Sequence, residues 1–134
     1  MHSFNELKKT KTLLVDDDEM IRDSLHIVFS NKGCCLKTVE TAENGLKALE
    51  EENFDIIISD LRLPGIDGLR FLKFASLIQP ESVKFLITAY KDDYIFSEAM
   101  RIGVHEFIEK PFAVKVFINL LAVALKRQKG KSAA

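Results

Sequence analysis

Short apolar runs alternate along the chain with longer segments in which apolar residues recur every three or four positions. Three of the runs are uninterrupted triplets, at residues 13–15, 56–58 and 85–87. Such runs are typical of parallel strands that are covered on both faces, so we expect central strands here. Residues 34–39 and 104–109 interleave polar and apolar side chains, which predicts two strands at the edges of the sheet.

The segments between these runs have the spacing of amphipathic helices. The apolar residues that mark four such helices are Ile21, Leu25, Val28 and Phe29; Ala42, Leu46 and Leu49; Leu69, Leu72 and Ala75; Val114, Phe117, Ile118, Leu121 and Leu125. A further helix is expected around residues 92–101, because two acids suit its start and Gly103 suits the residue after its end. The alternation predicts an α/β fold: a doubly wound, five-stranded parallel sheet in the order 2-1-3-4-5, with five helices on both faces.

The chain is long enough for one domain. It has 134 residues, of which 47% are hydrophobic and 29% are charged, so it can bury a core and remain in solution. No apolar run approaches the ~18 to 20 residues that cross a bilayer, and residues 1–10 lack the apolar segment of a secretory signal. We therefore expect a cytoplasmic protein, with an N-terminal extension at 1–10, a domain at 11–127 and a tail at 128–134.

The charge is distributed unevenly, although the net charge is -1. Six basic residues and no acidic ones follow Glu109, so the rest of the chain is acidic. A nucleic-acid platform needs a basic surface across the fold, and here only the tail is basic. We do not expect direct nucleic-acid binding, and interpret the basic tail as a solvated helix end or the start of a linker.

Acidic side chains follow two strands that the predicted order makes neighbours. Asp16 and Asp17 come directly after the first strand, and Asp60 ends the third. Carboxylates ~4 Å apart repel by about 1 kcal/mol in water and by more in a partly dehydrated cleft. A hard divalent ion, Mg²⁺ or Mn²⁺, would relieve this repulsion. Alternatively, acids in this place cap the next helix, and we expect Asp18 or Glu19 to do only that.

A hydroxyl and an ammonium group arrive at the same edge. Thr88 ends the fourth strand and Lys110 follows the fifth. Alone, each is more often a helix cap or a solvated surface residue. Together with metal-binding acids, they are the parts needed to neutralise a phosphoryl group.

Four motifs carry a resemblance to a known family: LLVDDD at 13–18, SDLRLPGIDGL at 59–69, ITAY at 87–90 and EKPF at 109–112. Over residues 12–127 the chain resembles the flavodoxin-like receiver domain of bacterial two-component response regulators. The resemblance implies that Asp60 is the phospho-acceptor and Asp17 the direct Mg²⁺ ligand. Asp16 would help to hold the ion, and Arg62 would offer it a backbone carbonyl.

The resemblance also assigns the remaining positions. Thr88 and Lys110 would contact the phosphoryl oxygens, Thr88 and Phe107 would form the switch, and the Lys110–Pro111 peptide would be cis. Arg62 and Tyr90 match positions that overhang the site and modulate it. We hypothesise that Tyr90 hinders the attacking water and lengthens the lifetime of the aspartyl phosphate.

In this family the donor is a phosphohistidine on a sensor histidine kinase or a histidine phosphotransfer protein. Phosphorylation of Asp60 would switch the surface of the fourth helix, the fifth strand and the fifth helix. The chain would be no enzyme beyond its own phosphorylation and dephosphorylation. Its output would be an unknown downstream protein or an output domain outside this sequence, and it would be a monomer or a phosphorylation-dependent homodimer.

Two other functions compete with this one. The spacing of Asp16 and Asp18 mimics the DxD motif of haloacid-dehalogenase-type phosphatases, but that family is larger, usually with a cap domain. A phosphate-independent interaction module with the receiver fold is the second alternative. It would not need the five polar residues of the site, which are Asp16, Asp17, Asp60, Thr88 and Lys110.

Overall fold

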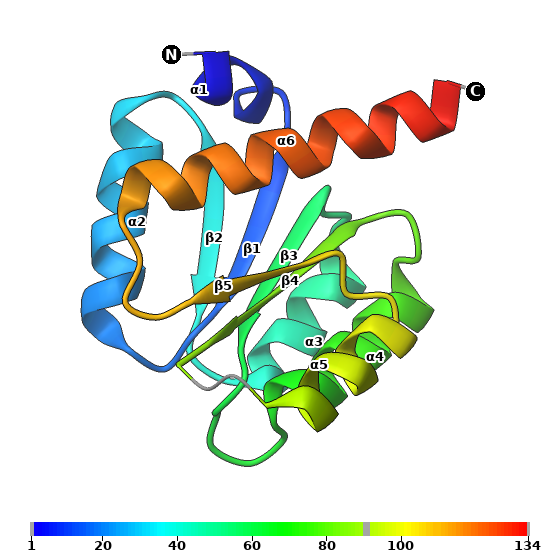
Figure 1. The fold of residues 1–134 in the computed structure, drawn as a ribbon. Coiled ribbons are helices and arrows are strands. Elements are labelled where there is room, and N and C mark those ends of the chain that lie inside the picture. The colour runs from blue at the N-terminus through cyan, green and yellow to red at the C-terminus, as the bar shows by residue number, and fades with distance from the viewer. Residues whose placement is uncertain (1, 90–91, 134) are drawn as a thin grey trace.

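The computed structural model describes residues 2–89 and 92–133 of the chain. Its centre is one parallel sheet in the order β2-β1-β3-β4-β5, as the sequence predicts (Figure 1). The strands are β1 (Lys11–Val15), β2 (Cys35–Val39), β3 (Ile56–Asp60), β4 (Val83–Thr88) and β5 (Glu106–Glu109).

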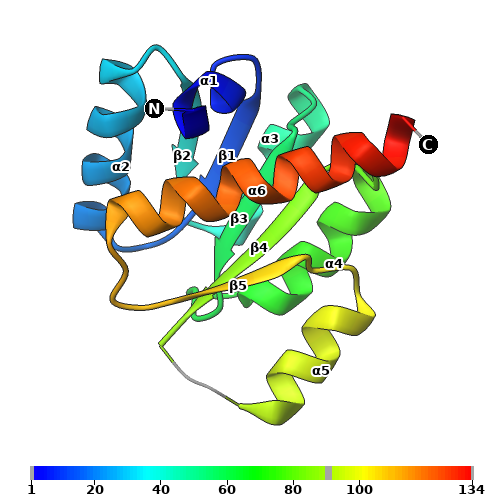
Figure 2. The ribbon, with the colours of Figure 1, turned by 45° about the horizontal axis from the view of Figure 1, so that its top comes forward.

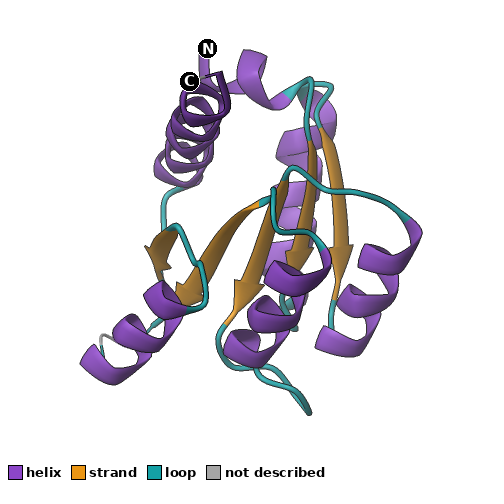
Figure 3. Ribbon diagram, turned by 90° about the vertical axis from the view of Figure 1, so that its right-hand side faces the viewer, coloured by secondary structure: helices purple, strands orange, loops and turns teal. Residues whose placement is uncertain are grey.

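Helices cover both faces of this sheet (Figure 3). The described residues contain α1 (His2–Leu7), α2 (Glu19–Asn31), α3 (Ala42–Glu51), α4 (Gly68–Ile78), α5 (Asp93–Arg101) and α6 (Val114–Ala133). Helices α1, α2 and α6 contribute to the apolar core on one face, and α3, α4 and α5 to the core on the other. None of these helices is long and apolar enough to cross a lipid bilayer.

The strands divide their side chains between the two cores. On β3, Ile56 and Ile58 enter the core beneath α2 and α6, whereas Ile57 enters the core beneath α3 and α4. This alternation follows from the two-residue period of a strand. Strands β3 and β4 are buried along their whole length, while β2 and β5 are partly exposed, so the predicted central and edge strands are confirmed.

Helix α1 is the one described helix that the sequence did not predict. It lies beside α6 within the stretch expected to be an N-terminal extension (Figure 2). Leu7 is buried, and Phe4 packs against the core while Lys32 Nζ lies 5.4 Å from its ring. At the other end of the chain, α6 continues to Ala133, through most of the residues assigned to a tail.

Acidic and hydroxyl side chains begin the helices at the carboxyl edge of the sheet. Asp18 accepts hydrogen bonds from the amides of Met20 and Ile21, which confirms its predicted capping role. Asp92 caps α5 in the same way, and Gly103 follows that helix with a positive φ of 99°. These caps fix where α2 and α5 begin.

At the opposite edge, the buried side chain of Gln79 joins two loops. Its Oε1 accepts from the amide of Phe54 at 2.8 Å, and its Nε2 donates to the carbonyls of Leu49 and Glu52 at 3.0 and 2.8 Å. One amide side chain thus satisfies three backbone groups that the fold removes from water. It ties the end of α3 to the end of α4.

Candidate functional site

The acid run after β1 contains three different environments. Asp16 has no exposed surface; its amide donates to the carbonyl of Val39 at 3.1 Å, and its Oδ1 accepts from the amide of Asp18 at 2.9 Å. Asp17 is exposed, and Asp18 caps α2. Only the first two therefore remain available for a ligand.

Asp60 ends β3 under close packing from the loop that follows. The amide of Gly68 donates to the carbonyl of Leu61 at 2.9 Å, where α4 begins. A Cβ atom added to Gly68 would lie 2.0 Å from the carbonyl oxygen of Asp60, far inside contact distance. A glycine at this position therefore lets α4 start directly against Asp60.

Asp16, Asp17 and Asp60 meet at the carboxyl edge of the sheet. Each offers one carboxylate oxygen, and these atoms lie within 4.8 Å of one another. The Oδ2 atom of Asp16 is buried and accepts no hydrogen bond from the described residues. An all-oxygen donor set that includes a buried carboxylate oxygen without a hydrogen bond fits a hard divalent cation such as Mg²⁺.

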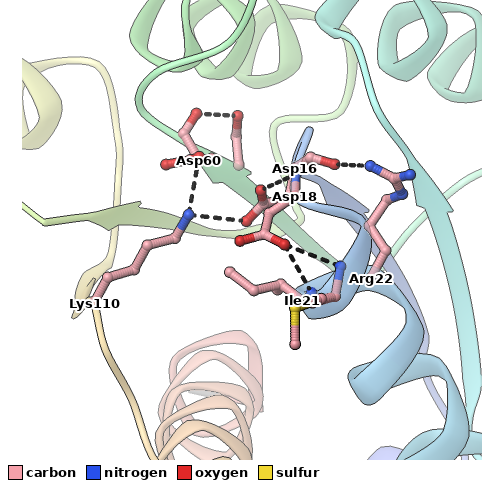
Figure 4. Close-up of polar contacts among 8 residues, drawn as sticks. Asp16, Asp18, Ile21, Arg22, Asp60 and Lys110 are labelled. Atoms are coloured by element: carbon pink, nitrogen blue, oxygen red, sulfur yellow. Dashed lines mark hydrogen bonds and ion pairs between the residues drawn. The ribbon is translucent and has the colours of Figure 1, made fainter.

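Lys110 reaches this cluster from the end of β5. Its Nζ donates to Asp60 Oδ2 at 3.0 Å and lies 3.4 Å from Asp16 Oδ2 (Figure 4). Burial lowers the pKa of Lys110, but the hydrogen bond to Asp60 and the charges of Asp16 and Asp60 outweigh it and raise the pKa above its ordinary value. The ammonium therefore stays charged at neutral pH. The Lys110–Pro111 peptide is cis, as the resemblance implied.

The charge balance at Asp16 still favours an added cation. Burial raises the pKa of Asp16, and the Asp60 carboxylate raises it further, while the Asp18 amide and Lys110 oppose the shift. The raised pKa means that the ionised form of Asp16 is disfavoured in the folded protein. A divalent ion on the unsatisfied oxygen would offset this cost.

The residues expected to form a switch lie beside the acids. Thr88 is buried at the end of β4, and its carbonyl accepts from the amide of Lys110 at 3.0 Å. Thr88 and the aromatic pair Phe96 and Phe107 line the same pocket of 310 Å³, and the two rings stack with centroids 4.7 Å apart.

The structure does not test the roles predicted for two residues that follow the strands. Arg62 has an exposed side chain two positions after Asp60. Tyr90 lies outside the described residues. Their expected roles as modulators of the site stay predictions.

Sequence analysis missed Arg22. This residue of α2 donates from Nη1 to the carbonyl of Asp16 at 2.8 Å, and its Nη2 lies 3.7 Å from Glu40. A signal was present, because a cation near a helix N-terminus opposes the helix dipole, and such local conflicts gather at functional sites.

A groove of 590 Å³ borders the acids on the side of α2. It runs from Asp18 and Met20 to Lys110, Pro111 and Phe112. Met20, at its rim, is 78% exposed.

A comparison with known protein families assigns the chain. Residues 12–122 match the response regulator receiver domain. The chain belongs to this family. Receiver domains are parts of two-component signalling systems. In this receiver domain the acidic cluster lies at the carboxyl ends of the strands.

Similar proteins support the assignment over most of the chain. The receiver domain is 34% identical over 99 residues to the transcriptional regulatory protein FixJ of Bradyrhizobium diazoefficiens, which is 74% of this chain and 48% of FixJ. It thus spans about half the length of this curated relative. A CheY-like receiver domain protein from Methanospirillum hungatei superimposes with a TM-score of 0.87 at 26% identity, over 91% of this chain and 98% of that one. The BeF3-activated DrrB receiver domain superimposes with a TM-score of 0.78 at 26% identity, over 87% and 97%.

Proposed function

We propose that this receiver domain accepts a phosphoryl group on the Asp60 carboxylate, in a Mg²⁺-dependent reaction with a phosphohistidine donor. The observation that carries the proposal is the meeting of three carboxylates and the Lys110 ammonium at one edge of the sheet. The similarity to a receiver domain activated by BeF3 supports it as well.

The chemical step is a nucleophilic displacement at phosphorus. A carboxylate oxygen of Asp60 attacks the phosphorus, and the bond between phosphorus and the donor imidazole nitrogen breaks, so that nitrogen keeps the electron pair. Lys110 already holds Asp60 Oδ2, so it is placed to contact a phosphoryl oxygen as the negative charge moves outward. The product is an aspartyl phosphate.

The site residues would hold the metal ion from one side. Asp16 and Asp17 supply carboxylates, Asp60 supplies a further oxygen, and Arg62 would add its backbone carbonyl. When bound, Mg²⁺ or Mn²⁺ offsets the repulsion between the carboxylate nucleophile and the phosphoryl oxygens. The buried Oδ2 of Asp16 supports this role, because it accepts no hydrogen bond from the described residues and its ionic neighbour, Lys110 Nζ, lies 3.4 Å away.

Thr88 and Phe107 would convert the new charge into a change of surface. The phosphoryl group adds strong acceptor oxygens, which draw the Thr88 hydroxyl toward Asp60. Phe107 can then turn into the cavity of 310 Å³ that Thr88 lines. This movement would alter the surface formed by α5, β5 and α6.

We further propose that the donor is a sensor histidine kinase or a histidine phosphotransfer protein that docks over the groove beside Lys110. Its histidine has to reach Asp60, so its surface has to cover the rim of the acidic cluster. Met20 and Phe112 offer apolar contacts at that rim, and they lie beside the charged site. The output would then pass to a downstream protein or to an output domain in a longer chain.

Arg62 and Tyr90 are proposed to set the lifetime of the aspartyl phosphate. A bulky Tyr90 would hinder the water that hydrolyses the phosphoryl bond. A Tyr90→Ala variant should therefore lose its phosphoryl group faster than the wild type. An unchanged rate of dephosphorylation would refute this role.

Intact mass after incubation with acetyl phosphate tests the proposed function. The wild type should gain one phosphoryl group with Mg²⁺ and none in EDTA, and Asp60→Asn should gain none. Asp23→Asn, which changes an exposed acid of α2 outside the site, serves as the matched control and should behave like the wild type. A folded wild type that gains no phosphoryl group would favour the phosphate-independent interaction module instead.

A further inference from the structure

The carbonyl oxygen of Asp16 has a side-chain partner that belongs to neither the acids nor Lys110. Arg22, in the first turn of α2, donates from Nη1 to this carbonyl at 2.8 Å. Its side chain is only 16% exposed, so the guanidinium is held between α2 and the acid loop. Figure 4 shows Arg22 and Lys110 on opposite sides of Asp16.

With this contact, the amide, the Oδ1 atom and the carbonyl of Asp16 each have a hydrogen-bond partner. Its amide is held by Val39 of β2, its Oδ1 by the amide of Asp18, and its carbonyl by Arg22. The carbonyl belongs to the peptide that joins Asp16 to Asp17, the two acids that the proposed function assigns to the metal ion. Holding that peptide therefore limits the relative orientation of both carboxylates.

We propose that Arg22 is a positioning residue for the Mg²⁺ site, which orients the Asp16–Asp17 peptide through its carbonyl and thereby raises the affinity for the ion. The inference rests on the proposed function. Arg22 itself touches neither the ion nor the phosphoryl group. Residues that orient metal ligands in this way commonly change metal affinity by about 10- to 100-fold when they are mutated.

The guanidinium could affect the ion in a second way, and the two effects have opposite signs. As a positive charge near the acids, Arg22 would repel a divalent cation, so its removal would tighten binding. As a positioning group, its removal would loosen the loop and weaken binding. The Arg22→Lys variant separates the two effects. Lysine keeps the positive charge, but it lacks the planar group that contacts Asp16 and Glu40 at once.

Glu40 offers a control on the same guanidinium. Its carboxylate is 3.7 Å from Arg22 Nη2 and its side chain is 64% exposed. An exposed ion pair of this kind contributes little to stability. Glu40→Gln leaves the hydrogen bond from Arg22 to Asp16 in place.

The test is isothermal titration calorimetry of Mg²⁺ alone into the wild type, Arg22→Gln, Arg22→Lys and Glu40→Gln. Circular dichroism melts in EDTA set a temperature at which every variant is folded. Arg22→Gln should bind Mg²⁺ about tenfold more weakly, and Arg22→Lys should also bind more weakly. Glu40→Gln should stay within about twofold of the wild type.

Three results would overturn the inference. Unchanged or tighter Mg²⁺ binding by folded Arg22→Gln would show that the arginine acts through charge or serves the fold alone. If Arg22→Gln does not fold, wild-type affinity in Arg22→Lys has the same consequence. A wild type that binds no Mg²⁺ would instead remove the proposed function and, with it, this inference.

Discussion

At the scale of single residues, neighbours of the same chemical type have different roles. Asp16 is buried with an unsatisfied oxygen, Asp17 is exposed, and Asp18 caps a helix. The backbone sets this division, because the chain leaves a strand at Asp16 and enters a helix after Asp18. The sequence shows only a run of four acids here, and that run does not distinguish these roles.

Gly68 links the packing of α4 to the position of Asp60. We predict that Gly68→Ala lowers the free energy of unfolding by about 1 to 3 kcal/mol, because the new Cβ meets the Asp60 carbonyl and the backbone has to move. The same movement should slow phosphorylation by acetyl phosphate. Chemical denaturation and intact mass measure the two effects. Gly33→Ala is the control. A Cβ added to Gly33 has no atoms within 4 Å, but the φ of this residue is 70°, so the variant shows the effect of backbone strain alone.

Lys84 is a buried base, 2% exposed, whose Nζ donates to the carbonyl of Gln79 at 2.7 Å. Burial lowers its pKa from 10.5 to about 8, and the charge of Glu81 opposes the shift only partly. Between these two pH values the unfolded chain binds more protons at Lys84 than the folded protein, so stability rises with pH. The destabilising contribution is present in full below pH 8 and fades toward pH 10.5.

We therefore predict that the wild type becomes more stable relative to Lys84→Met as the pH rises from neutrality to about 10, by about 2 to 3 kcal/mol. Urea denaturation of both proteins across this range measures the difference. Taking the difference cancels the titration of groups that both proteins share. A constant difference would mean that Lys84 titrates alike in the folded and unfolded states.

At the scale of elements, the stack of Phe96 on Phe107 joins α5 to β5. The rings are 4.7 Å apart and 20° from parallel, and Phe96 is 53% exposed. In the proposed switch, Phe107 has to leave this stack to enter the cavity beside Thr88. If the switch works as proposed, the stack on Phe96 favours the unphosphorylated arrangement.

We predict that Phe96→Ala shifts the equilibrium toward the inward position of Phe107. Aromatic pairs contribute about 0.5 to 1.5 kcal/mol beyond their burial, which corresponds to a two- to twelvefold shift in population. ¹⁹F NMR of fluorophenylalanine at position 107 reports the populations with and without acetyl phosphate. Met100→Ala, which removes another exposed apolar side chain of α5, is the control. Equal populations in wild type and Phe96→Ala would exclude the stack as a restraint.

The elements show how far the sequence predicts this structure. The central strands, the edge strands and four of the helices follow from apolar patterns, because β3 and β4 are covered on both faces and the helices on one. Helix α5 follows from the acids at its start and the glycine after its end. The convergence of the acids with Lys110 follows from the strand order. Helix α1 does not follow, because its two apolar contacts, Phe4 and Leu7, form no recognisable stripe without α6. Lys84 does not follow either, because a lysine indicates an exposed position.

At the scale of the whole molecule, α1 and the end of α6 lie at the opposite end of the sheet from the carboxyl ends of the strands, where the acidic cluster lies (Figure 1). Chain joined at either terminus would start on the far side from Asp60.

Metal binding should also be visible in the stability of the whole domain. We predict that Mg²⁺ raises the melting temperature of the wild type, because an ion that binds only the folded state stabilises it. The gain is about 2.7 kcal/mol at a concentration one hundred times the dissociation constant. Asp17→Asn should lose most of this gain, whereas Asp55→Asn, an exposed acid at the opposite edge of the sheet, should keep it. An equal rise with Na⁺ at matched ionic strength would indicate general screening instead.

The most direct test of the central claim is to locate the phosphoryl group. After reaction with acetyl phosphate and Mg²⁺, borohydride reduces an aspartyl phosphate to homoserine, and peptide mass spectrometry identifies the position. We predict homoserine at position 60 and none at positions 16 and 17. Homoserine at either of those positions, or none in a protein that has gained a phosphoryl group, would contradict the assignment of Asp60 as the acceptor.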